Sequence, residues 1–358
     1  MRVYYVLLIS FLIVELQGTA GWISSGISRP RVNPFSSSSS SSSPSSFRDQ
    51  HFLSTVKSTT ANSIPIPTPT IKEGLLPRLV IIIPAYNEEN RIRSTLECYQ
   101  DFLLKKSISS NNNDDPGDND NDISSAILFR EVEIVIVDDG SIDSTCEIIQ
   151  NFPAKIPIRT ISMEENKGKG AAIARGVQYI VDNNTDNNKS TGTLILTQDA
   201  DGSGDLIYLN DMLVKLRKLL QVDGSSFIDW SIPGIVIGNR NYKIFSSRGI
   251  TRIGFQTCVR ILTMNKLRIQ DSQCGYKLMT LNASKKIYKN LHLQGWSHDV
   301  EVLYRAKILN IPIDEMSIDW KDKDGSKVVE SGIIKVSFQM LWDVIRLRWN
   351  YSIVKRWK

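Results

Sequence analysis

Three clusters of acidic and polar residues each follow a short apolar run, and their side chains are of the types that bind ligands or catalyse reactions. They are Pro84-Ala85-Tyr86-Asn87-Glu88, Asp138-Asp139-Gly140-Ser141 and Asp199-Ala200-Asp201. In an open α/β sheet, ligands bind outside the carboxyl ends of the strands. Any one cluster alone could be a solvated turn with a helix cap. Together they predict one site, built from segments about 50–60 residues apart in the sequence.

The side chains of these clusters are oxygen ligands, and no His or Cys lies among them. Such ligands favour Mg²⁺ or Mn²⁺, which one or two carboxylates plus substrate phosphates usually hold. Asp199 and Asp201, two residues apart, can present both carboxylates to one ion and its bound diphosphate. A divalent cation that neutralises the charge on a departing nucleoside diphosphate is the chemistry of a nucleotide-sugar transferase.

Buried strands and amphipathic helices must position these clusters. Short apolar runs of the kind found in parallel sheets occur at Leu79–Ile83, Ile134–Val137 and Leu194–Thr197. Helices are predicted between them by the spacing of Ile92, Leu96, Tyr99 and Leu103, by a capping box at Ser144–Glu147, and by Ala171–Ile180. The alternation indicates an α/β domain with a mainly parallel sheet flanked by helices. A GxGxxG motif is absent, which disfavours a dinucleotide-binding domain.

Composition narrows the class of protein further. The 358 residues are 41% hydrophobic, which suits a globular core and is too low for a polytopic membrane protein. The net charge of +5 equals that of residues 333–358 alone, which carry six basic side chains and one acidic one. Because the rest of the chain is neutral, no nucleic-acid-binding surface is indicated. The four Cys are scattered, which excludes a disulfide framework, and with only three His in the chain a Cys/His zinc site is disfavoured.

Residues 1–23 have a basic start and an apolar run, and we expect a signal anchor or membrane segment there; a cleaved signal peptide is the alternative. Residues 24–77, which include eight consecutive serines, read as a disordered Ser/Pro-rich linker. The catalytic domain is predicted over 78–332, with low-complexity insertions at 107–125 and 182–191.

Residues 333–358 predict a basic amphipathic helix at the membrane interface. One apolar stripe at helical spacing is formed by Ile334, Phe338, Leu341, Ile345 and Trp349. Helices that combine Trp with basic residues lie in the bilayer interface, where Lys and Arg are attracted to anionic lipids. A helix that packs the same stripe on its own domain is the alternative.

The polar clusters, in order, resemble the motifs of the family 2 glycosyltransferases. Two further segments extend the match, Asn166-Lys167-Gly168-Lys169-Gly170 and Gln270-Asp271-Ser272-Gln273-Cys274-Gly275-Tyr276-Lys277-Leu278. The resemblance covers roughly residues 78–345 and implies a GT-A (Rossmann-like) fold. The second segment, Asp299-Val300-Glu301, and Trp320 followed by Gly325-Ser326-Lys327 resemble the members that use dolichyl phosphate and UDP-glucose.

This resemblance implies roles for individual residues of the donor site. The nucleotide pocket would be lined by Pro84, Tyr86, Glu88, Val137 and Asp139, with Ala200 touching the donor. Asp199, Asp201 and Ser203 would hold Mg²⁺ or Mn²⁺, with Asp201 counted as catalytic. Lys321 and Lys327 would grip phosphate, Lys327 as a catalytic residue. Ser203 replaces the Gln of mannose-transferring relatives, and Lys321 replaces their Arg.

The acceptor site is expected around Asp271, Lys277 and Asp299. Asp271 could act in catalysis, or it could be structural and orient Lys277 or the acceptor. A lipid phosphate is already an anionic nucleophile at neutral pH, so no general base is strictly needed.

The resemblance therefore implies an inverting transfer of glucose from UDP-glucose to dolichyl phosphate for protein N-glycosylation. A mannosyl transferase using GDP-mannose and a non-catalytic nucleotide-sugar-binding protein are the alternatives. We expect a single-pass protein of the endoplasmic reticulum membrane whose catalytic domain faces the cytosol, where nucleotide sugars are made.

Overall fold

Strands and helices alternate along most of the chain, as the apolar pattern predicted. The computed structural model describes residues 76–109, 129–184, 192–221, 228–240, 247–263, 267, 269–320 and 333–357. The three predicted strands are confirmed as β1 (Arg78–Ala85), β2 (Glu131–Asp138) and β4 (Thr193–Thr197). Their side chains are almost entirely buried, which explains why the sequence shows unbroken apolar runs instead of alternation.

Seven strands of the described residues form one mixed sheet in the order β3-β2-β1-β4-β6-β5-β7. The strands not foreseen from the sequence are β3 (Ile158–Ser162), β5 (Ile235–Arg240), β6 (Lys277–Thr280) and β7 (Ile313–Ile318). Only β6 runs against its neighbours β4 and β5, and the other pairings are parallel. Lys277 pairs with Thr197, so the start of β6 lies at the edge where β4 ends.

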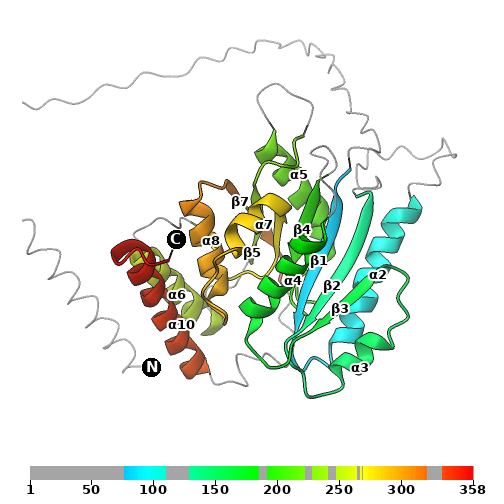
Figure 1. Cartoon of the computed structure of the whole chain (residues 1–358), viewed down its shortest axis with the longest axis horizontal. Helices are drawn as coiled ribbons and strands as arrows, with labels where there is room; N and C mark the ends of the chain where they lie inside the picture. Colours follow the sequence, from blue (N-terminus) through cyan, green and yellow to red (C-terminus); the bar gives the residue numbers. More distant parts are fainter. Residues whose placement is uncertain are drawn as a thin grey trace, which may run out of the picture. The chain divides into compact units, whose positions relative to one another are not determined.

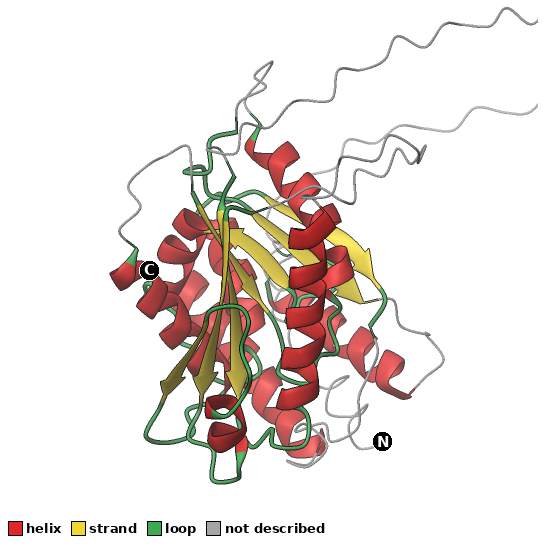
Figure 2. Ribbon diagram, turned by 90° about the vertical axis from the view of Figure 1, so that its right-hand side faces the viewer, coloured by secondary structure: helices red, strands yellow, loops and turns green. Residues whose placement is uncertain are grey.

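Helices cover both faces of the sheet (Figures 1 and 2) because successive side chains of each strand point to opposite faces. Val80 and Ile82 belong to one apolar core, and Leu79, Ile81 and Ile83 belong to the other. The first core includes residues of α4 (Lys169–Asn183), α6 (Ser247–Leu262), α7 (Leu281–Tyr288), α8 (His298–Ile308) and α10 (Ile333–Arg348). The second includes residues of α2 (Ile92–Ser109), α3 (Thr145–Gln150), the short η3 (Leu206–Tyr208) and α5 (Leu209–Leu220).

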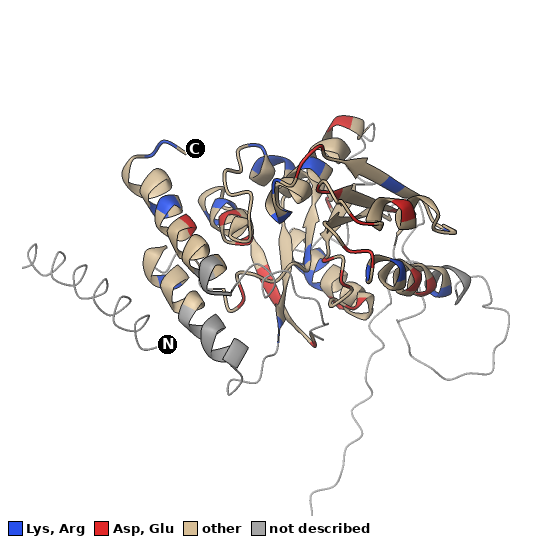
Figure 3. Ribbon diagram, turned by 90° about the horizontal axis from the view of Figure 1, so that it is seen from below, with Lys and Arg blue, Asp and Glu red and all other residues tan. Residues whose placement is uncertain are grey.

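Helix α10, with the π-helical turn η4 (Trp349–Ile353) after it, lies beside α6. Val344 and Leu347 are fully buried in the core, whereas Phe338 of the predicted apolar stripe is 51% exposed. Trp349, the last residue of the stripe, is 56% exposed, and Trp342, which lies beside the stripe, is 63% exposed. Figure 3 shows little charge along the described part of α10, with basic residues toward its C-terminal end. The stripe is therefore divided, because Leu341 and Ile345 are partly buried and pack against the first core, as the alternative expected, whereas Phe338 and Trp349 are exposed.

The predicted membrane segment at residues 1–23 lies outside the described residues, as does nearly all of the linker at 24–77. Most of the two predicted insertions is likewise outside them, although α2 extends to Ser109 and α4 to Asn183. Among the helices that the structure describes, none is both long and apolar enough to span a bilayer.

Candidate active site

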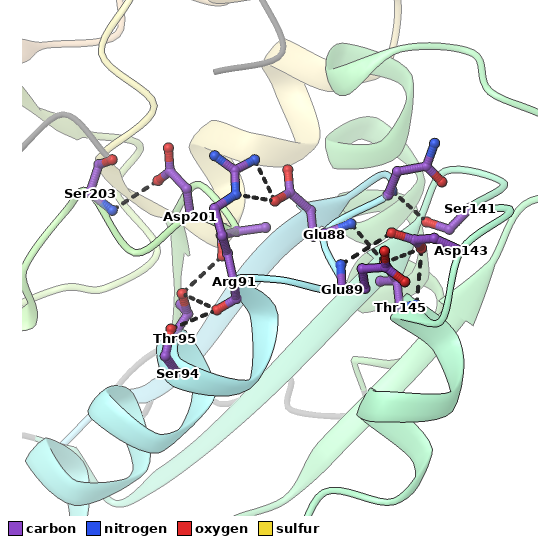
Figure 4. Close-up of polar contacts among 12 residues, drawn as sticks. Glu88, Glu89, Arg91, Ser94, Thr95, Ser141, Asp143, Thr145, Asp201 and Ser203 are labelled. Carbon is purple, nitrogen blue, oxygen red and sulfur yellow. Dashed lines mark hydrogen bonds and ion pairs between the residues drawn. The ribbon is translucent and has the colours of Figure 1, made fainter. Parts of the chain in front are cut away.

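The loop after β1 and the loop after β2 are joined by side-chain hydrogen bonds (Figure 4). The Asn87 N–H donates to Ser141 Oγ at 2.9 Å, and the Asn87 carbonyl oxygen Oδ1 accepts from the Ile142 N–H at 2.9 Å. Asn87 has a φ of 52°, a left-handed conformation that Asn tolerates better than most residues. The first two polar clusters therefore form one unit, as their positions after neighbouring parallel strands predicted.

Asp143 holds the other end of this unit. Its carboxylate accepts hydrogen bonds from the Glu89 N–H at 3.2 Å and from the Thr145 N–H at 3.0 Å. Burial alone would raise the pKa of Asp143, but these bonds and one from the Thr145 hydroxyl outweigh it and lower the pKa. Helix α3 begins where the capping box predicted, but the Ser144 side chain makes no capping hydrogen bond. The Asp143 carboxylate instead accepts a hydrogen bond from the Thr145 N–H at the start of α3.

Glu88 and Tyr86, predicted to line the nucleotide pocket, follow β1 at the carboxyl edge. The Glu88 carboxylate is buried in an ion pair with Arg91, at 2.5 Å from Nη2 and 2.7 Å from Nε. Tyr86 is half-buried, and Pro84 is buried within β1 itself. Glu88 thus lies beside a fixed cation, which the sequence analysis did not identify.

Asp139 and Val137 lie at the end of β2, but their side chains do not both face outward. The Asp139 carboxylate accepts from the backbone N–H groups of Lys167 and Gly168, at 2.9 and 2.8 Å. Burial nevertheless raises its pKa above the ordinary value. The Val137 side chain is fully buried in the core, and the predicted place of this residue beside the nucleotide stays a prediction. Asp139 fixes the loop that leads into α4.

Asp199, the first aspartate of the Asp-x-Asp turn after β4, forms an ion pair. Its Oδ1 lies 2.6 Å from Nζ of Lys169, at the start of α4. Burial alone would lower the pKa of Lys169, but Asp199 and then Asp299 outweigh it and raise the pKa, so the side chain is an ammonium. A Cβ on Gly275 would lie 2.6 Å from the Asp199 carboxylate, so a larger residue there would displace the Asp199 side chain.

Asp201 and Ser203 have the features of an oxygen-ligand site. The Ser203 N–H donates to Asp201 Oδ1 at 2.8 Å, and the two side chains lie side by side in Figure 4. Among the described contacts, the buried Ser203 hydroxyl has no hydrogen-bond partner, an exception that a ligand would explain. The described residues contain no cluster of three His, Cys, Asp or Glu suited to a metal. These residues fit a cation that substrate phosphates complete, as Mg²⁺ usually binds.

Asp271 is fully buried and paired with Arg240 at the end of β5. Its oxygens lie 2.6 Å from Arg240 Nε and 3.0 Å from Nη2, a bidentate pair. The Arg240 guanidinium lies 5.3 Å from the centre of the Trp320 ring. Asp271 therefore orients Arg240.

Lys277 and Asp299, the other predicted acceptor residues, are buried and bond to each other. Burial would raise the pKa of Asp299, but His298, Lys277 and Lys169 lower it well below the ordinary value. His298 lies 3.4 Å from Asp299, and burial lowers the pKa of His298 to about 4. Both side chains are buried in an ion pair, and their role in the acceptor site stays a prediction.

Lys321 and Lys327 lie outside the described residues. Three cations at the carboxyl edge were not predicted from the sequence, namely Arg91, Lys169 and Arg240. Lys169 could have been predicted as a site residue, since it stands between two glycines at the start of a predicted helix. Arg240 could not have been, because β5 was not predicted.

A mainly parallel sheet with an Asp-x-Asp turn and a set of fixed cations at its carboxyl edge is the arrangement of a nucleotide-sugar-dependent glycosyltransferase with the GT-A fold. Comparison with known families agrees with this class. The chain belongs to glycosyl transferase family 2, whose model matches residues 80–282.

Several curated relatives have the same name as one another and match most of this chain's length. The chain is 33% identical to the dolichyl-phosphate beta-glucosyltransferase of Dictyostelium discoideum, over 77% of this chain and 75% of that protein. It is 31% identical to the Saccharomyces cerevisiae enzyme of the same name, with the same coverage. The Homo sapiens enzyme of that name is 30% identical over 73% of this chain and 72% of its own. A solved structure, glucosyl-3-phosphoglycerate synthase from Mycobacterium tuberculosis, has a TM-score of 0.48 at 14% identity, covering 78% of this chain and 85% of that chain.

Proposed function

We propose that this chain transfers glucose from UDP-glucose to dolichyl phosphate, giving dolichyl β-D-glucosyl phosphate for protein N-glycosylation. The observation that carries the proposal is the identity of 30–33%, over about three quarters of the chain, to three enzymes named for this activity. The Asp-x-Asp turn and the cations at the carboxyl edge are the groups that such a reaction needs.

In the proposed reaction, a phosphate oxygen of dolichyl phosphate attacks the anomeric carbon of glucose from the face opposite the UDP. The new C–O bond forms as the bond from the anomeric carbon to the β-phosphate oxygen of UDP breaks, and UDP leaves with the electron pair. No proton must be removed from the nucleophile, because a phosphate monoester is anionic at neutral pH. Asp271, held by Arg240, is therefore assigned to positioning and not to general-base catalysis.

Asp201 and Ser203 are the residues we propose to hold Mg²⁺ or Mn²⁺. When bound, the cation would stabilise the negative charge on the departing diphosphate. Asp199 is less suited to direct coordination, because Lys169 already neutralises its carboxylate. Lys321 and Lys327 remain proposed phosphate ligands from the sequence resemblance.

Labelled nucleotide sugars distinguish the proposed activity from its alternatives. Membranes that contain the full chain are incubated with dolichyl phosphate and either UDP-glucose or GDP-mannose. Label in the lipid fraction from UDP-glucose supports the proposal. Label from GDP-mannose alone would identify a mannosyl transferase, and binding of UDP-glucose without transfer would identify a non-catalytic protein.

The exposed face formed by Phe338 and Trp342 of α10 and by Trp349 at the start of η4 is the proposed membrane surface of the described domain. Trp342 and Trp349 are more than half exposed, and basic residues follow them in the same segment. Aromatic and basic side chains together suit an anionic lipid surface. Replacing both Trp by Ser should reduce sedimentation with anionic vesicles, while Val214→Ser on α5, across the sheet, should not. Equal sedimentation of all three proteins would reject this surface.

We also propose the endoplasmic reticulum membrane as the location, with residues 1–23 as an uncleaved anchor and the catalytic domain in the cytosol. The cytosol supplies nucleotide sugars, and the four cysteines are free, as in a reducing compartment. Glycan attachment at Asn183 or Asn188, detected as a mobility shift on deglycosylation, would place the domain in the lumen. Asn282 is a poorer reporter, because its side chain is partly buried and donates to the Ser231 carbonyl at 2.7 Å, whereas Asn183 is exposed.

A further inference from the structure

Lys169 is brought to the carboxyl edge by the way α4 begins. Gly168 precedes it with a φ of 98°, a conformation that favours glycine. A Cβ on Gly170 would lie 2.4 Å from the His298 Cβ, so α4 and α8 start in close contact. Two glycines therefore fix the backbone on either side of Lys169. Its side chain, only 13% exposed, reaches Asp199 at the end of β4.

The backbone at the start of α4 is already occupied. The N–H groups of Gly170 and Ala171 both donate to the Gln294 carbonyl, at 2.7 and 3.2 Å. Helix N-termini often bind phosphate through such N–H groups. Here those two donors are used, so the positive group that this helix offers at the edge is the Lys169 ammonium.

The contacts of this ammonium leave room for a further acceptor. An ammonium has three N–H donors. Among the described residues, its polar contact is Asp199, and the Trp296 ring centre lies 5.9 Å away. A mostly buried cation is stable when several acceptors surround it. Asp199 belongs to the Asp-x-Asp turn, so an acceptor beside Lys169 would belong to a ligand of that turn.

We propose that Lys169 is a donor-site residue that binds the β-phosphate of the nucleoside diphosphate, and that Asp199 is the counter-ion that positions it. This inference rests on the proposed function, because it takes a nucleotide sugar as the donor. The two aspartates then have different tasks. Asp199 acts through Lys169, whereas Asp201 and Ser203 bind the cation. Lys169 lies beside the bond that breaks and stabilises the charge of the leaving diphosphate.

Calorimetric titration of the full chain with UMP, UDP and UDP-glucose, each with Mg²⁺, tests this assignment. Lys169→Met should weaken UDP and UDP-glucose binding by roughly tenfold or more, because a charge-assisted hydrogen bond is lost. UMP lacks the β-phosphate, so its affinity should stay unchanged, which also shows that the variant is folded. Lys169→Arg should recover part of the UDP affinity. Lys167→Met is the matched control, since Lys167 is exposed and pairs with Glu165 at 3.6 Å; its affinities should equal those of the wild type.

Three results would overturn the assignment. In the first, Lys169→Met binds UDP as tightly as the wild type does. In the second, Lys169→Met loses affinity for UMP and UDP equally. In the third, Lys169→Met loses affinity for UDP-glucose alone, which would indicate a contact with the sugar. The transfer assay separates this inference from the proposed function. Glucose transfer by the wild type with normal UDP binding by Lys169→Met rejects the inference alone. Selective loss of UDP affinity without wild-type transfer supports Lys169 and rejects the function.

Discussion

Asp271→Asn separates the two roles considered for this residue. Asp271 is fully buried and Arg240 is 16% exposed, so the substitution leaves a mostly buried guanidinium without its counter-charge. Removing one partner of a buried ion pair costs about 3–5 kcal/mol of unfolding free energy. At roughly 2–4 °C per kcal/mol for a domain of this size, the melting temperature should fall by roughly 6–20 °C.

The assay pairs thermal unfolding with acceptor kinetics on the same preparations. The double variant Arg240→Gln/Asp271→Asn removes both charges and should recover much of the lost stability without restoring activity, since the guanidinium is gone. A single Asp271→Asn variant that melts like the wild type but transfers no glucose would refute the positioning role. That result would instead support a direct catalytic role for Asp271, which is one of the two roles considered from the sequence.

Three further predictions concern the donor site and the buried network. Asp201→Asn should abolish transfer with a nearly unchanged melt; retention of more than about a tenth of the activity, a barrier change of only ~1.4 kcal/mol, would reject its metal role. Lys327→Ala should lower kcat more than it raises the donor KM, because a cation in the proposed position would stabilise charge that grows in the transition state; a pure KM effect would instead assign Lys327 to positioning. His298 has a folded pKa of about 4, below its ordinary 6.5, so it binds protons more readily when unfolded. Its contribution to stability is full above about pH 6.5 and is lost as the pH falls toward 4; His298→Gln should flatten urea-unfolding profiles over that range, and identical profiles would contradict this.

The sequence predicted β1, β2 and β4 from their apolar runs but missed four strands, of which β5 and β6 are also buried on both faces. Ile134–Val137 is predicted as a strand because every residue is apolar, whereas Ile158–Ser162 lies at the sheet edge, is partly exposed and mixes apolar with polar residues. The four residues of β6 are too few to show a period, and their reversed direction depends on pairing with β4. Strand direction of this kind is a tertiary property.

The candidate site was predictable as a set of acidic clusters but not as a set of ion pairs. Clusters that follow neighbouring parallel strands must meet, and Asn87 and Ser141 do. The partner of Asp199 comes from the start of α4, and that of Asp271 from the end of β5. Neither pairing follows from local spacing, because each joins residues about 30 positions apart.

The hydrogen bonds between the loops after β1 and β2 have a consequence for hydrogen exchange. The N–H groups of Asn87, Glu88 and Glu89 donate to side chains of the second loop, and that of Ile142 donates back to Asn87. Because each of these bonds joins the two segments, separation of one segment from the other breaks all four bonds in a single opening event. The amides of both loops should therefore exchange at a common rate, and a nucleotide that contacts one loop should slow the exchange of both.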